Sequence, residues 1–142
     1  MSVTLLSAST IVDAALAKGR EMKLAPLTVV VLDAGGHFVA LKREDGSGIL
    51  RVEIARGKAY GALGIGGGSR VLAKRAEVAP AFVDALAAAS GGRVVPVPGG
   101  VLIRQGGAVL GAVGVSGDLS DNDEAAALAG IAAAGLEADT GA

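Results

Sequence analysis

Cationic and acidic side chains gather around the stretch that joins a predicted strand to a predicted helix. Arg43 ends the strand, Asp45 lies in the Gly-rich loop that follows, and Arg56 and Lys58 come within the helix. Arg43 and Lys58 are candidate catalytic residues, because they suit an anionic substrate and a buried lysine can act as a base or form a Schiff base. Asp45 and Arg56 are candidate ligand-binding residues. Arg56 also lies three residues after Glu53, the spacing of an ordinary ion pair on a helix surface.

A second set of candidates lies where the last predicted strand leads into the last helix. Asp123 and Glu124 open that helix, where carboxylates ordinarily cap it and suit its dipole. Alternatively, Glu124 acts as a general acid or base and Asp123 binds ligand. The turn at Gly99 and Gly100 can offer backbone N–H groups to an anion. Ser116 is a further ligand-binding candidate on a Gly-flanked bend, but its neighbours lack the frame of a serine nucleophile.

His37 is the chain's single histidine, so it supplies the only imidazole for metal ligation or proton transfer. It directly follows a Gly-Gly turn and is expected at the surface or at the rim of a pocket. One histidine cannot form a closed zinc site, so carboxylates would have to complete a metal site there. The alternative is a turn residue that hydrogen-bonds the backbone.

Hydrophobic periodicity predicts the elements that position these residues. The Pro- and Gly-containing stretch 94–100 is expected to be an edge strand with a tight corner. Residues 64–69 are expected to be a flexible connector, because the Lys-Ser/Thr pair of a phosphate loop is missing. The tail, residues 137–142, is expected to fray. The predicted helices span residues 9–23, 49–63, 80–89 and 120–136, with a helical turn at 70–75, and the other strands span 27–33, 37–43, 101–104 and 108–115.

The strand at 108–115 carries Gly111 and Gly114 inside an otherwise apolar run. Glycine weakens a strand, so its presence here indicates that a helix, a partner chain or a ligand approaches the backbone closely. Strands joined by hairpins, with helices between them, predict an α+β domain with an antiparallel sheet. The alanine-rich helices and the 23 glycines favour close packing between subunits, so a homo-oligomer is expected.

Length and composition exclude several classes of protein. The 142 residues predict a single domain over 1–142. A net charge of −1 without a basic block, and an aromatic content of 2%, argue against nucleic-acid binding. The absence of cysteine excludes disulfides and thiolate chemistry. No stretch has the length of a membrane helix and no signal peptide is visible, so a cytoplasmic protein without membrane contact is expected.

A set of short motifs, taken in order and spacing, resembles the GlcG/HbpS-like family, which includes the C-terminal domain of PduO. The resemblance covers nearly the whole chain. It implies a profilin-like antiparallel sheet of about five strands flanked by helices, a homo-oligomer, and binding or handling of haem. With haem as the implied cofactor, His37 is the candidate iron ligand. The motifs are VVVLDAGGH at 29–37, REDG at 43–46, IARGKA at 54–59, PGGVLI at 98–103, and GAVGVSG at 111–117 followed by DNDE at 121–124.

Three functions remain open from the sequence. The first is a haem-binding or haem-handling protein. The second is a cofactor-independent enzyme, an isomerase, hydratase or lyase, which performs acid–base chemistry on a small carboxylate or carbonyl compound at a subunit interface. The third is a non-catalytic oligomeric accessory or sensor module. The first two require a small-molecule ligand, and the sequence does not decide whether the protein is an enzyme.

Overall fold

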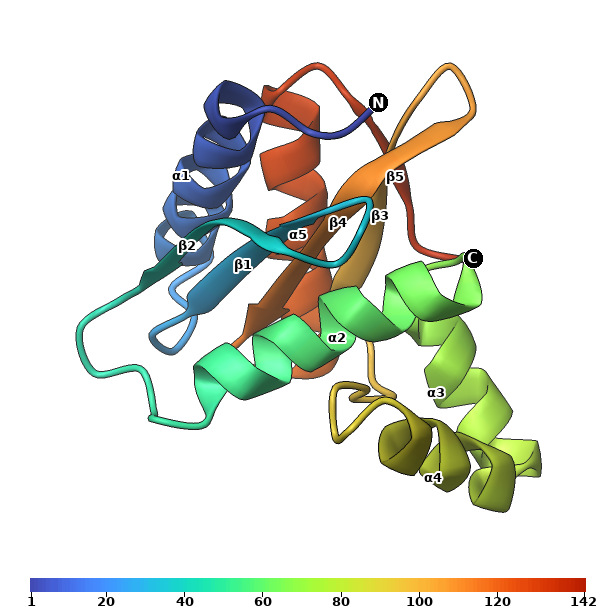
Figure 1. Ribbon diagram of the computed structural model, residues 1–142. Coiled ribbons are helices and arrows are strands. Elements are labelled where there is room, and N and C mark those ends of the chain that lie inside the picture. Colours follow the sequence, from blue (N-terminus) through green and yellow to red (C-terminus); the bar gives the residue numbers. More distant parts are fainter.

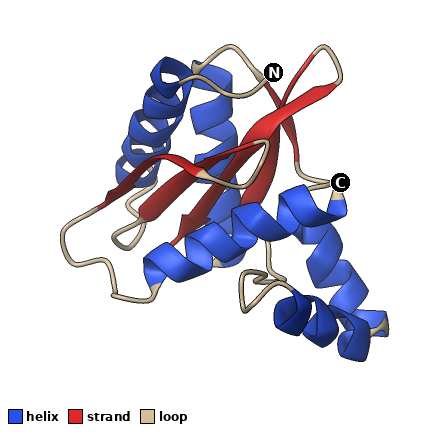
Figure 2. Cartoon of the chain, in the orientation of Figure 1, coloured by secondary structure: helices blue, strands red, loops and turns tan.

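Five strands form one antiparallel sheet in the order β2-β1-β4-β3-β5, and helices cover both of its faces (Figures 1 and 2). The computed structural model describes residues 1–142. The predicted α+β class and antiparallel sheet are confirmed. The elements are α1 (Leu5–Glu21), β1 (Thr28–Asp33), β2 (Phe38–Arg43), α2 (Arg51–Ile65), α3 (Ser69–Val78), α4 (Pro80–Ala89), β3 (Gly100–Gln105), β4 (Ala108–Ser116), α5 (Ser120–Ala133) and β5 (Glu137–Asp139).

Strand β1 is buried on both faces of the sheet, which explains its continuous apolar sequence. Successive side chains of a strand point to opposite faces. Val29 and Val31 therefore join the larger core beneath α1 and α5, whereas Val30 and Leu32 pack with alanines of α2 in the smaller core. Figure 1 shows α1 and α5 side by side on one face of the sheet and α2 crossing the other face.

The two glycines of β4 allow close approach within the chain. A Cβ atom at Gly114 would overlap the backbone carbonyl of Ala55 in α2, and one at Gly111 would overlap the carbonyl of Leu32 in β1. The close approach predicted from the sequence is therefore made by a helix and a neighbouring strand. Alanines on α2 let its backbone come this near to the sheet, and this approach brings Lys58 under β4.

Both ends of the chain are more ordered than the sequence predicts. Helix α1 begins at Leu5, because the Thr4 hydroxyl accepts the backbone N–H of Ser7 at 3.1 Å and caps the helix. The tail forms β5, which pairs with β3, and the Arg104 guanidinium holds Asp139 at 2.8 Å. The prediction of a frayed tail is wrong because this cross-strand ion pair was not visible in local sequence.

The predicted flexible connector at 64–69 instead has a defined conformation between two helices. Gly66 adopts a left-handed conformation with φ of 82° and ends α2, and the Gly68 backbone packs against Thr140 of the tail. Helix α3 starts directly afterwards, at Ser69, and is longer than the predicted turn. Residues 94–99 form no strand. No helix combines the length and the apolar character that crossing a membrane requires.

Candidate functional site

Lys58 and Asp123 form a buried ion pair between α2 and the start of α5. The Lys58 Nζ donates to Asp123 Oδ2 and to the carbonyl of Val115, both at 2.9 Å. The residues are 2% and 1% exposed. A Cβ atom at Gly99 would lie 2.9 Å from Lys58 Nζ, and one at Gly100 would overlap the Lys58 carbonyl. The lysine itself therefore occupies the space beside the glycine turn.

Burial governs the ionisation of this pair. Burial lowers the pKa of Lys58 and raises the pKa of Asp123, and in each case the charge of the partner opposes the effect. The remaining oxygen of Asp123 accepts the backbone N–H of Asp118 at 3.0 Å. Each group is thus held by partners inside the protein, as a buried charge requires.

Glu124 is bound by a residue that sequence analysis did not single out. Arg70 of α3 donates through Nε and Nη2 to both carboxylate oxygens of Glu124, at 3.1 Å each, and also contacts Asp121. These bonds raise the pKa of Arg70 above its ordinary value. Glu124 forms no capping box, and its fork-to-fork contact with Arg70 joins α3 to α5. The sequence offered no signal for this pair, because its members are far apart along the chain.

The Ser69 and Ser116 hydroxyls near the glycine turn are also occupied. The Ser69 hydroxyl accepts the backbone N–H of Gly100 at 2.8 Å and donates to the carbonyl of Val97 at 2.6 Å. The Gly100 N–H is thus bound within the chain. Ser116 is fully buried, and its hydroxyl accepts a hydrogen bond from Arg51 at 3.1 Å. We call the set Lys58, Ser69, Arg70, Ser116, Asp123 and Glu124 the buried polar network.

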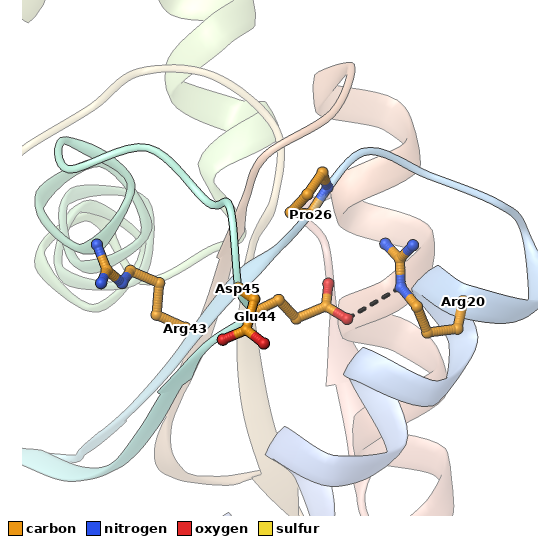
Figure 3. Close-up of a pocket in the computed structure, with 5 residues that line it drawn as sticks. All are labelled: Arg20, Pro26, Arg43, Glu44 and Asp45. Atoms are coloured by element: carbon orange, nitrogen blue, oxygen red, sulfur yellow. Dashed lines mark ion pairs between the residues drawn. The ribbon is translucent and has the colours of Figure 1, made fainter.

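Arg43 and Asp45 lie apart from this network, at a hollow of about 470 Å³ (Figure 3). Arg20 binds Glu44 there at 2.9 Å, and Arg43 points away from that pair. Neither Arg43 nor Asp45 has a hydrogen-bond or ion-pair partner. The structure therefore does not bring Arg43 and Lys58 together, and the hollow's charged groups do not converge on one point.

His37 lies on the exposed turn between β1 and β2. One oxygen of Asp33 accepts the backbone N–H groups of Gly35 at 2.9 Å and of His37 at 3.0 Å. The same oxygen lies 3.3 Å from Nδ1 of the His37 ring, whose side chain is 81% exposed. The backbone bond from His37 is the main cause that lowers the pKa of Asp33. Asp33, not His37, therefore holds the turn, and the imidazole Nε2 has no partner.

Two hollows lie near this turn, and Tyr60 and Gly64 line both, whereas His37 itself lines neither. The first, of about 170 Å³, lies between the turn and α2, and the second, of about 220 Å³, lies between α2 and α4. At Gly36, with φ of 84°, a Cβ atom would lie 2.9 Å from the Tyr60 ring. We call these hollows together the Tyr60 surface. It is lined by Ala34, Gly35, Gly36, Tyr60, Gly61, Leu63, Gly64, Ile65, Leu86, Ala89, Ser90 and Val94.

Arg56 does not form the predicted ion pair with Glu53. Its guanidinium carbon instead lies 5.1 Å from the centre of the Phe38 ring, on the strand that follows the turn. Arg93 is placed in the same way at 5.7 Å from the Tyr60 ring. No group of three or more histidine, aspartate or glutamate side chains could hold a metal ion, so the carboxylates that would complete a protein-only metal site at His37 are missing.

Comparison with known proteins gives a consistent result. A family model described as "haem degrading protein HbpS-like" matches residues 3–132. An uncharacterized 15.0 kDa protein encoded in the dhaT-dhaS intergenic region of Citrobacter freundii is 30% identical over 122 residues, which is 86% of this chain and 84% of that protein.

Solved structures share the fold. The PduOC:haem complex has a TM-score of 0.86 at 22% identity, covering 96% of this chain and 98% of that chain. A double mutant of HbpS from Streptomyces reticuli has a TM-score of 0.79 at 27% identity, covering 93% and 86%. Another HbpS structure has a TM-score of 0.81 at 28% identity, covering 93% and 89%. The family model matches nearly the whole of this chain, residues 3–132, so the chain belongs to the HbpS-like family.

Proposed function

We propose that this protein binds haem, with Nε2 of His37 as an axial ligand of the iron. The observation that carries the proposal is the exposed imidazole whose other nitrogen lies 3.3 Å from the Asp33 carboxylate. Histidines that bind metals in proteins commonly donate their second N–H to a carboxylate, which fixes the ring and raises the basicity of the ligand. Haem would bring its own nitrogen ligands for the iron, so one histidine from the protein is sufficient.

The surroundings of His37 suit a porphyrin. The Tyr60 surface starts at the turn that carries His37 and offers one aromatic ring and several aliphatic side chains. A porphyrin face is apolar and would bury part of this surface. Bound haem supplies redox and ligand-binding chemistry through its iron. The protein's own part is to orient the imidazole through Asp33 and to provide an apolar wall at Tyr60. The family match and the haem complex of PduOC are consistent with this assignment.

The buried polar network favours haem binding over cofactor-independent acid–base catalysis. Lys58 and Asp123 bind each other, and both oxygens of Glu124 bind Arg70. None of the four hollows in the structure is lined by these residues or by Gly99 and Gly100. A substrate at this network would need space that the side chains already fill. We therefore assign the network a role in stability.

We also infer that the protein forms a homo-oligomer. Strand β2 is an edge of the sheet and exposes the apolar side chains of Phe38 and Leu41. Ile49 and Leu50, which follow in the loop before α2, are 84% and 65% exposed. Exposed apolar side chains near an open sheet edge are typical of surfaces that a partner chain covers. Light scattering on the purified protein tests this inference, and a monomer at micromolar concentration would contradict it.

A haemin titration tests the proposed function. We expect a saturable Soret band in the wild-type protein and its loss in His37→Ala. Lys42→Ala is a matched control, because Lys42 lies on β2, the strand that follows the His37 turn, and its exposed side chain pairs only with Asp13. It should bind haemin like the wild type. Equal, non-saturating responses of all three proteins would overturn the proposal and leave the ligand-free accessory module as the better account.

A further inference from the structure

Two arginines flank the turn that carries His37, and each is held against an aromatic ring. Arg56 lies over Phe38, the residue that directly follows His37. Arg93 lies over Tyr60, whose ring contributes to both hollows of the Tyr60 surface. A guanidinium group over a ring face is attracted by the ring's quadrupole, so its position is restricted. Arg93 is therefore held at the ring that lines both hollows, and Arg56 at the ring next to His37.

Neither of these guanidinium groups has a carboxylate partner in the protein. Arg20, Arg70 and Arg104 all form ion pairs. Arg56, in contrast, leaves Glu53 unpaired, and its Nε is buried without any hydrogen-bond partner. Because that Nε is buried, an anion would have to bind the terminal Nη groups of Arg56, which likewise form no ion pair in the protein. Apolar surface bordered by such donors indicates a ligand that is flat or apolar and also carries negative charge.

We propose that Arg56 and Arg93 bind the propionate carboxylates of the porphyrin, so that this surface selects porphyrins with free acid groups. The inference rests on the proposed function, because His37 must first place the porphyrin at the Tyr60 surface. Guanidinium groups present parallel N–H donors that match both oxygens of a carboxylate. The two arginines would thus set the orientation of the macrocycle, while His37 binds its metal.

The test compares haemin with haemin dimethyl ester, in which both propionates are neutral. Affinities are measured by Soret titration for the wild type, Arg56→Gln, Arg93→Gln and the double variant. Arg75→Gln is the matched control, because Arg75 of α3 lies in the same way over a ring, Phe82 of α4 at 5.5 Å, but that ring neither adjoins His37 nor lines a hollow of the Tyr60 surface. Each single variant should lose about threefold to tenfold in haemin affinity, as expected for charge-assisted contacts at a partly exposed site.

The ester separates a carboxylate contact from a general loss of structure. Wild-type affinity for the ester should already be reduced, and the glutamine variants should bind the ester as the wild type does. Arg56→Lys, which keeps the charge, should retain part of the haemin affinity and covers the case in which Arg56→Gln disturbs α2. Haemin binding that depends on His37 but is unchanged in the double variant would overturn this inference alone. Absence of saturable haemin binding to the wild type would overturn this inference and the proposed function.

Discussion

The buried polar network and the His37 turn are built from similar residue types but differ in how their polar atoms are satisfied. Lys58 and Asp123 are almost inaccessible and bind each other. His37 and Asp33 also lie close together, yet the imidazole is largely exposed and its second nitrogen is free. A polar group whose bonds are complete inside the fold contributes to stability, whereas one with an open position at the surface is available to a ligand. The contrast separates the two roles.

The largest expected effect is on stability, at Lys58. Replacing Lys58 by Met leaves the Asp123 carboxylate buried without its cation, because its remaining partner is the Asp118 N–H and the nearby Asp118 carboxylate has the same charge. Loss of one partner of a buried ion pair costs about 3–5 kcal/mol. Urea unfolding followed by circular dichroism should show a decrease of this size in the free energy of unfolding.

The double variant Lys58→Met with Asp123→Leu is the control for this prediction. It removes both charges and should recover much of the lost stability, because an apolar pair avoids the cost of desolvation. A Lys58→Met protein as stable as the wild type would show that the pair carries no structural role.

A smaller loss of stability is expected at Arg70. Replacing Arg70 by Met removes the bidentate partner of Glu124, a residue that is only 9% exposed. An unpaired, nearly buried carboxylate costs about 1–3 kcal/mol. Because Glu124 retains some access to water, the loss should be smaller than at Lys58. Arg75→Met, on the exposed part of the same helix, should have little effect, and urea midpoints that rank these two variants in reverse order would contradict the account.

The two regions should also respond oppositely to acid. The pKa of Asp33 is lowered below 3.8, so its contribution to stability is present above that value and is lost as the pH falls through its folded pKa. The pKa of Asp123 is raised by burial, so its protonation occurs at higher pH in the folded state and favours folding as the pH falls. Urea unfolding between pH 6 and 3 should therefore show a shallower acid loss in Asp33→Asn than in the wild type. If the free energy of unfolding depended on pH in the same way in both proteins, the Asp33 carboxylate would not be stabilising the folded state.

The smallest effect on stability is expected at His37. The side chain of His37 packs against little, so His37→Ala should change the free energy of unfolding by no more than about 0.5 kcal/mol. The same variant should abolish saturable haemin binding. Thermal unfolding without ligand, measured beside the haemin titration, checks both parts. A large loss of stability would mean that His37, like the buried polar network, serves mainly to stabilise the fold.

The sequence predicted the elements of the fold better than the contacts of the candidate residues. The continuous apolar run of β1, the Gly-Gly turn before His37 and the close approach at Gly114 all follow from local patterns. The partner of Lys58 does not, because Asp123 lies 65 residues away and only the packing of α2 against β4 brings them together. The β5 strand was missed for the same reason, since its pairing with β3 depends on Arg104 and Asp139.

The partner of Arg56 was also predicted wrongly, because an aromatic ring from another part of the chain lies beside it. Glu53 and Arg56 have the spacing of an ion pair on a helix, but the fold places Phe38 beside Arg56. The chain has only three aromatic side chains. Two of the three, Phe38 and Tyr60, adjoin the single histidine's turn, which composition alone could not reveal.

Chemical rescue of His37→Ala by imidazole tests the central claim most directly. If His37 contributes only its imidazole, free imidazole should restore haem retention to the variant, because Asp33, Tyr60 and both arginines remain in place. Gel filtration, with absorbance recorded at the Soret band and at the protein band, measures the haem that elutes with the protein. The account predicts co-elution that increases with imidazole concentration and saturates. Haem that elutes separately from the variant at every imidazole concentration, while the wild type retains it, would contradict a site preformed around the ligand. Equal retention by both proteins without imidazole would contradict ligation by His37.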